Sequence, residues 1–131
     1  MLKELIEILN ECEHLKNITP CASDTELDTV ALMPYDGRIV RKYTDGKTLN
    51  SSSFKLLYKT YYSPYGDKFY EADDFFDNVK NWIDNRFKDK SVTVQNIEFI
   101  SALCDNQYKL YRKTPSAAIY SLKFQTDYFI L

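Results

Sequence analysis

The stretch IVRKYTDGKTLNSSSFKLLYKTYY, residues 39–62, carries the most information about the fold. It begins as a short strand with two basic residues and ends as a second strand rich in tyrosine, with Asp45-Gly46 as a turn signal between them. The polar run Asn50–Ser53 lengthens this connection well beyond a tight turn. From the residues alone, the connection Arg38 to Phe54 is interpreted equally well as a projecting β-hairpin arm and as a disordered surface loop.

The composition is that of one soluble globular domain. The 131 residues suffice for a single core, and 44% are hydrophobic and 27% charged. Eleven tyrosines and eight phenylalanines against three glycines favour a sheet or a docking surface. The formal net charge of −2 argues against nucleic acid as the main ligand. Lys109, Arg112 and Lys113 form a local basic cluster, which we expect on a solvated loop.

The cellular compartment follows from the cysteines and the N-terminal segment. Cys12, Cys21 and Cys104 are odd in number and lack C-x-x-C spacing, which favours reduced thiols over a disulfide or a zinc site. Glu4 and Glu7 interrupt the segment that a secretory signal would need to be apolar. Since no run of about 18 apolar residues indicates a membrane span, we expect a cytoplasmic protein until it joins a larger assembly.

Apolar periodicity predicts the order of helices and strands. Spacings of three and four residues indicate a helix over 2–14 and a longer one with an apolar stripe from Ala72 to Phe87. Strands are expected at 29–33, 38–43, 54–62, 92–102 and 120–130. The prediction is a single α+β domain, 1–131, with a mainly antiparallel sheet of about four strands, two helices packed on one face and the projecting β-hairpin arm.

Residue types used in catalysis and metal binding are present without the spacing that such sites need. His14 lies near the end of the first predicted helix and has no nucleophile at a recognisable distance. Asp73, Asp74 and Asp77 cluster near the start of the second, where the helix dipole favours negative charge, so we expect a solvated face. Cys104 follows an apolar strand and is expected to be buried. We predict a non-enzymatic interaction domain that binds no cofactor and no metal.

The strand and turn IVRKYTDG, the polar insertion and the aromatic strand FKLLYKTYY resemble a family of small phage proteins. These are encoded in the head–tail region of bacteriophages of Gram-positive hosts and of phage-derived particles, and are often labelled minor capsid proteins. The similarity continues through DDFFDNVKNWID (73–84), TVQNIEFISA (93–102) and IYSLKFQTDYFIL (119–131). It covers roughly residues 29–131, and the wider group is the tail terminator, or tail completion, protein.

The resemblance implies a virion structural protein and not an enzyme. Tail terminators form a ring, usually of six copies, at the head-proximal end of the tail tube, where they stop polymerisation and present a head-joining surface. The implied partners are further copies of the chain and the tail tube protein, with the sheath or head connector in addition. DNA would only pass through the lumen, and the protein would reside in a virion or a bacteriocin-like, phage-tail-like particle assembled in the bacterial cytoplasm.

The same resemblance implies which residues make the assembly contacts. The arm would reach the next subunit or the tube through Arg41, Lys42, Tyr43, Asp45 and Lys47. Two alternatives remain open. One is a head-completion or stopper protein that contacts the connector; the other is a small acidic immunity or inhibitor domain, whose helix from Asp73 to Asp84 would mask a basic partner.

Overall fold

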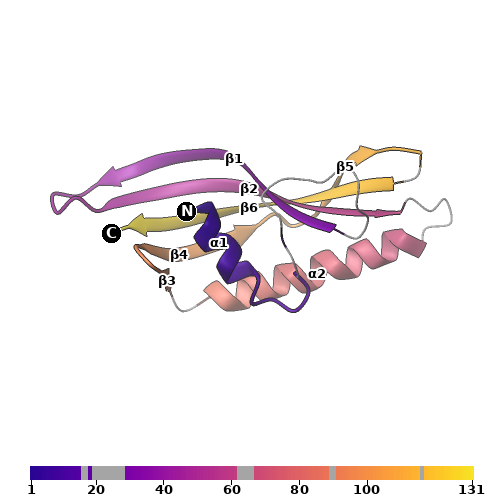
Figure 1. The fold of residues 1–131 in the computed structure, drawn as a ribbon, viewed down its shortest axis with the longest axis horizontal. Helices are drawn as coiled ribbons and strands as arrows, with labels where there is room; N and C mark the ends of the chain where they lie inside the picture. Colours follow the sequence, from indigo (N-terminus) through magenta and orange to yellow (C-terminus); the bar gives the residue numbers. More distant parts are fainter. Residues whose placement is uncertain (16–17, 19–28, 62–66, 89–90, 116) are drawn as a thin grey trace.

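The computed structural model describes residues 1–15, 18, 29–61, 67–88, 91–115 and 117–131. In chain order the elements are α1 (Leu2–Leu9), β1 (Thr29–Lys42), β2 (Thr48–Tyr61), α2 (Asp67–Phe87), β3 (Val92–Val94), β4 (Ile97–Cys104), β5 (Lys109–Lys113) and β6 (Ala117–Ile130). The six strands form one antiparallel sheet in the order β1-β2-β6-β4-β3, with β5 also paired to β6 (Figure 1). The predicted α+β class and mainly antiparallel sheet are confirmed.

The long strands β2 and β6 form the centre of the sheet. They pair without interruption from Thr48 opposite Ile130 to Tyr61 opposite Ala117. The other edge of β6 is shared: β4 pairs with its C-terminal half and β5 with its N-terminal half. The chain therefore leaves the sheet after β4 and rejoins the same edge at β5, which leaves the connecting residues 105–108 beside α2.

One core lies between the helices and a single face of the sheet. Because side chains alternate along a strand, Phe54 and Phe124 point to the same face, where their rings stack at 5.4 Å. Both helices contribute to this core. Its helical members are Leu5, Ile8, Leu9, Phe76, Val79, Ile83 and Phe87. The opposite face carries a smaller cluster of Ala31, Leu57 and Ile119, so the expectation of both helices on one face is confirmed.

The helices differ from the sequence expectation mainly in length. The first was predicted over 2–14, but α1 ends at Leu9, and Cys12 and Leu15 stay buried beyond it. Trp82 is only half-buried, at the margin of the α2 stripe. Within the described part of the chain, neither helix is long and apolar enough to cross a membrane.

The sheet has six strands where about four were expected, and local geometry explains the difference. The predicted strand 92–102 is two strands, because Gln95 takes a positive φ of 56° and turns the chain between β3 and β4. The basic cluster expected on a loop is strand β5, whose five residues are all exposed. The predicted break between 33 and 38 is a bulge within β1, at Tyr35.

The polar run Asn50–Ser53 forms part of the interior strand β2, and not an excursion from the sheet. Each of its first three side chains is buried and hydrogen-bonded. The Asn50 amide donates to the Thr48 side chain at 2.9 Å, Gln125 donates to Ser51 at 2.7 Å, and the hydroxyls of Ser52 and Tyr128 lie 2.9 Å apart. These partners satisfy the polar groups, so the segment remains in the sheet despite its composition.

Candidate functional site

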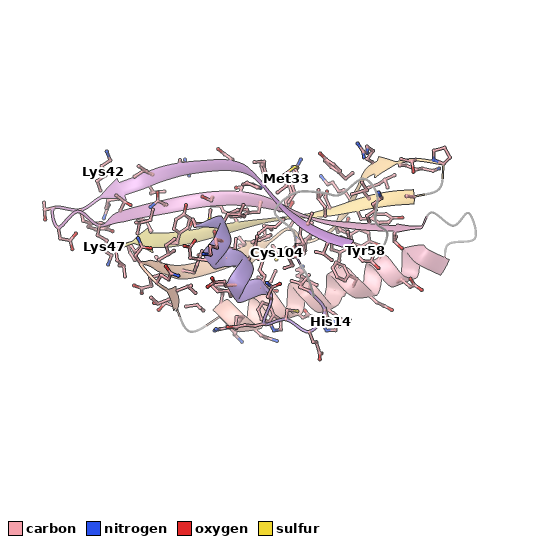
Figure 2. All side chains as sticks on the ribbon, viewed as in Figure 1. His14, Met33, Lys42, Lys47, Tyr58 and Cys104 are labelled. Carbon is pink, nitrogen blue, oxygen red and sulfur yellow. The ribbon has the colours of Figure 1, made fainter. Side chains whose placement is uncertain are left out.

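The residues predicted to make assembly contacts lie together at the turn between β1 and β2. Arg41 and Lys42 end β1, and the chain reverses over 43–47. We call residues 41–47 the hairpin tip. It lies at one end of the long axis of the molecule, whereas β5 and the N-terminal half of α2 lie toward the other end (Figure 1). Lys42 and Lys47 mark this end in Figure 2.

Backbone hydrogen bonds close the hairpin tip. The Tyr43 N–H donates to the Lys47 carbonyl at 2.9 Å, and the Gly46 N–H donates to the Tyr43 carbonyl at 3.1 Å. The Asp45 carboxylate accepts from the Lys47 N–H at 3.0 Å. Gly46 has a φ of +90°, which a residue with a Cβ adopts only with strain. The Asp-Gly pair therefore determines the turn, and Asp45 stabilises it locally.

The hairpin tip is anchored to the sheet by Phe129, a half-buried residue of β6. The Lys47 ammonium lies 3.9 Å from the centre of the Phe129 ring, and the Tyr43 ring meets it edge-on at 6.0 Å. Both contacts lie on the face of the sheet opposite the helices, since the adjacent Tyr128 is part of the helical core. Lys47 and Tyr43 are thus held in place by the fold.

This geometry changes the predicted arm. An arm from Arg38 to Phe54 is wrong as a free projection, because β2 pairs with β6 as far as Thr48. Of the five predicted contact residues, Asp45 and Lys47 also support the turn. Arg41 and Lys42 are exposed, and neither forms an ion pair with another described residue.

The strand that leads to the hairpin tip exposes apolar side chains. β1 is an edge strand of the sheet, and Tyr35, Ile39 and Val40 on it are 47–54% exposed. Its two bulges, at Tyr35 and Val40, interrupt the regular edge, which disfavours unspecific strand pairing. Apolar side chains beside unpaired cations are typical of a protein contact surface.

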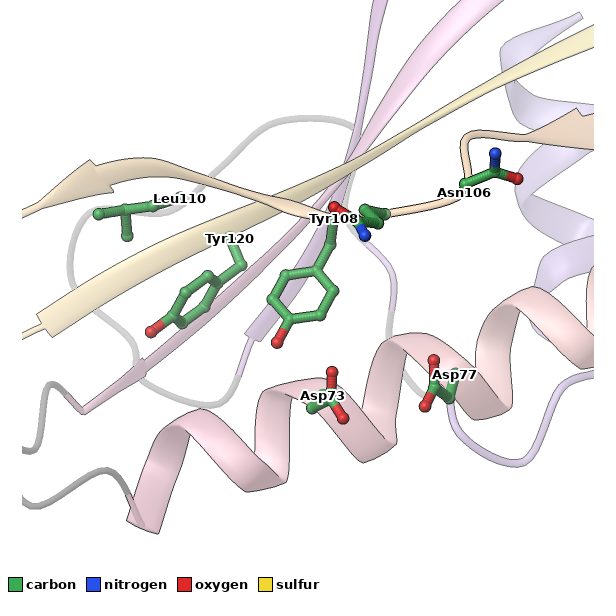
Figure 3. A pocket seen from close by; sticks show the side chains of 7 residues that line it. Asp73, Asp77, Asn106, Tyr108, Leu110 and Tyr120 are labelled. Carbon is green, nitrogen blue, oxygen red and sulfur yellow. The ribbon is translucent and has the colours of Figure 1, made fainter.

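A second surface lies toward the opposite end, where the residues after β4 leave the sheet above α2. It is a pocket of about 510 Å³, and its lining is Asp73, Asp77, Asn106, Gln107, Tyr108, Leu110 and Tyr120. Figure 3 shows the two aspartates rising from α2 toward the two tyrosine rings. We call this the acidic pocket.

The wall of the acidic pocket is built on the core. The Tyr108 ring stacks on the buried Phe76 at 4.8 Å and meets the Tyr120 ring edge-on at 5.7 Å. These aromatic contacts hold the rings in fixed orientations, so the pocket is formed before any ligand binds.

Two carboxylates from α2 line the acidic pocket. Asp73 and Asp77 are four residues apart on α2, a spacing at which like charges repel. Neither forms an ion pair with another described residue. Burial and the neighbouring Asp73 carboxylate raise the pKa of the Tyr108 hydroxyl above its usual value. The combination of two carboxylates, two amides and two aromatic rings is suited to an organic cation.

The remaining candidates from the sequence are Cys104 and His14. Cys104 is buried as predicted, and burial, followed by the charge of Asp84, raises the pKa of its thiol to about 12. His14 lies 3.5 Å from the exposed Glu13 carboxylate. Among the described residues, no group of three or more His, Cys, Asp and Glu side chains could hold a metal ion.

Sequence reasoning found the hairpin tip and missed the acidic pocket. Asp73, Asp74 and Asp77 of α2 were expected on a solvated face, which holds for the exposed Asp74 and Asp77 but not for the half-buried Asp73. The pocket depends on Tyr108 and Tyr120, which no local pattern connects to α2.

A scan against protein-family models gives no match for this chain, and a search of curated proteins finds no significant relative.

Proposed function

We propose that the protein is a structural subunit of a phage-type tail. Copies of it would form a ring, with six copies as the expected number, at the head-proximal end of the tail tube. The ring would end tube polymerisation and provide the surface to which the head is joined. The tail tube protein would be its axial partner.

The observation that carries this proposal is the position and chemistry of the hairpin tip. An elongated subunit has Arg41 and Lys42, which form no ion pair with another described residue, at one end, beside the exposed Ile39 and Val40. A rigid, basic and partly apolar end is suited to contact with another protein chain. The order of helix and strand motifs that resembles tail terminators supports the same role.

The phenotype of particles that lack this chain tests the proposal directly. Tail length would be measured by negative-stain electron microscopy in the phage or tail-like particle that encodes it. Overlong tubes without heads are the expected result. Tails of normal length that fail to join heads would instead indicate the stopper function, and particles indistinguishable from wild type would refute both assembly roles.

A second measurement tests the hairpin tip within that role. Replacing Arg41 and Lys42 by Glu reverses two exposed charges that have no ion-pair partner in the described structure, so the monomer fold should remain intact. We expect normal circular dichroism and a block of tail completion. Reversal of the exposed Lys88 and Lys109, at other surfaces, is the matched control and should leave tails normal.

The acidic pocket favours a second candidate function, a small inhibitor or immunity domain that binds a basic partner. Asp73 and Asp77 would then receive a basic side chain of that partner. Cosedimentation separates the two functions. A tail subunit should travel with the tube at low copy number, whereas an inhibitor should remain in the supernatant as a stoichiometric complex.

A further inference from the structure

We propose that the hairpin tip of one copy binds in the acidic pocket of the next copy, with the Arg41 guanidinium between the Asp73 and Asp77 carboxylates and the rings of Tyr108 and Tyr120. This inference rests on the proposed assembly function and names the subunit contact that would build the ring.

The acidic pocket has the chemistry of a guanidinium receptor. A guanidinium is planar, always charged and rich in donors, so it can bond to carboxylates and amide oxygens while its face lies on an aromatic ring. Asp73 and Asp77 supply carboxylate acceptors, and Asn106 and Gln107 are also among the lining residues. A cation between the two carboxylates would also relieve their mutual repulsion along α2.

The hairpin tip provides such a cation in a fixed position. Arg41 and Lys42 are neighbours in a strand, so their side chains point to opposite faces and only one of them can enter a pocket. The bonds that close the turn and the contacts of Lys47 with Phe129 hold the strand end rigid. Little backbone conformational entropy would therefore be lost when the hairpin tip binds, and the ordering cost is confined to the Arg41 side chain.

The two surfaces cannot meet within one copy, because they lie toward opposite ends of the molecule (Figure 1). A contact between two different patches on identical chains is heterologous, and its repetition closes into a ring or continues as a filament. Two of the three basic side chains of β5 point away from the pocket in their own chain: Lys109 and Arg112 lie opposite Ser121 and Ile119, on the other face of the sheet from Tyr120. The third, Lys113, is not among the residues that line the pocket.

Complementary variants test this pairing. The first variant carries Arg41→Glu and Lys42→Glu, which reverses the two positive charges of the hairpin tip and leaves the acidic pocket intact. The second carries Asp73→Asn and Asp77→Lys, which removes both carboxylates of the acidic pocket and leaves the hairpin tip intact. Sedimentation velocity at about 0.5 mM protein and low salt would measure self-association, since screening weakens charge pairing. Circular dichroism would verify that each variant folds.

The expected outcome has two parts. Each variant alone should self-associate at least tenfold more weakly than the wild type. An equimolar mixture should form a one-to-one heterodimer and nothing larger, because only one intact tip and one intact pocket remain. The control chains, Lys88→Glu with Lys109→Glu and Asp84→Asn with Asp105→Asn, should associate like the wild type.

Zero-length cross-linking would locate the contact independently. A carbodiimide joins a lysine to a carboxylate only when they touch, and mixing 14N- and 15N-labelled chains separates links between copies from links within one. We expect mixed-isotope links from Lys42, at the rim, to Asp77. Mixed links that exclude both the hairpin tip and α2 would overturn the pairing.

Three results of the sedimentation experiment would also overturn it: a wild-type chain that stays monomeric, variants that associate as strongly as the wild type, or a mixture without heterodimer. Each of these leaves the tail function separately testable. If tubes are overlong in particles without the chain, only this subunit contact is wrong. If the pairing holds and tails are normal, the chain assembles elsewhere.

Discussion

The contact between Lys47 and Phe129 should make a measurable contribution to the stability of the hairpin tip. The Lys47 ammonium lies 3.9 Å from the ring centre, and both side chains are half-buried. An exposed cation–π pair contributes about 0.5–1 kcal/mol, and partial burial places this pair near the upper end of that range. We therefore expect a coupling of about 1 kcal/mol between the two residues.

A double-mutant cycle isolates this coupling. Lys47→Met keeps the apolar stem of the side chain and removes the charge, while Phe129→Leu keeps much of the apolar area and removes the ring. The free energy of unfolding would be measured by urea denaturation for the wild type, both single variants and the double variant. Hydrogen exchange of the Tyr43 and Gly46 amides, whose bonds close the turn, would report local opening of the tip.

A second double-mutant cycle, between two residues that do not touch, gives the baseline for the coupling energy. Lys123 is on the same strand face as Phe129 but six residues away, roughly 20 Å along β6, so Lys123→Met combined with Phe129→Leu should be additive. A Lys47–Phe129 coupling below about 0.3 kcal/mol, together with unchanged exchange at the turn, would refute the idea that the sheet anchors the hairpin tip.

Three further predictions follow from the described contacts. The Thr126 hydroxyl is fully buried and has no hydrogen-bond partner in the described structure, so Thr126→Val should stabilise the protein by about 1 kcal/mol in urea unfolding; a loss of stability would show that the hydroxyl is bonded. Gly46→Ala should cost about 1 kcal/mol by the same assay, because Gly46 has a φ of +90° and only strain, not a clash, opposes the methyl group. Since the folded pKa of Cys104 is raised from 9.0 to about 12, its stabilising effect should be complete below pH 9 and be lost as the pH rises toward 12, by up to about 1.4 kcal/mol per pH unit. Cys104→Ala should flatten this alkaline decline, and an unchanged slope would contradict the assignment.

Local sequence patterns were sufficient to predict the helices and strands in which buried residues recur at a regular spacing. The alternation of apolar residues in β6 and their spacing of three to four residues in α2 each predict one buried apolar face. In the structure, these two faces pack in the same core. The burial of Cys104 followed from its place after an apolar strand. The Asp45-Gly46 turn could also be predicted from the sequence, because residues other than glycine rarely adopt the positive φ that Gly46 has.

Polar segments were misread for one physical reason. Whether Ser51 and Ser52 can be buried depends on partners that are distant in the sequence, Gln125 and Tyr128 on β6. The sequence shows the polarity of the run but not the neighbouring strand that satisfies it. The strand β5 was missed similarly: its residues are all exposed, so no apolar period marks it, and only its pairing with β6 defines it.

The sequence by itself determined the fold class, the two helices on one face and the basic turn at Arg41 and Lys42, because these depend on periodicity and turn chemistry within short segments. The tertiary structure alone decided that the turn is anchored by Phe129, and that Asp73 and Asp77 face Tyr108 and Tyr120 across a pocket. These contacts join residues that are tens of positions apart. The anchor arises where β2 pairs with β6, and the pocket arises where β4 and β5 share the other edge of β6. Such juxtapositions are properties of the folded sheet and not of any single segment.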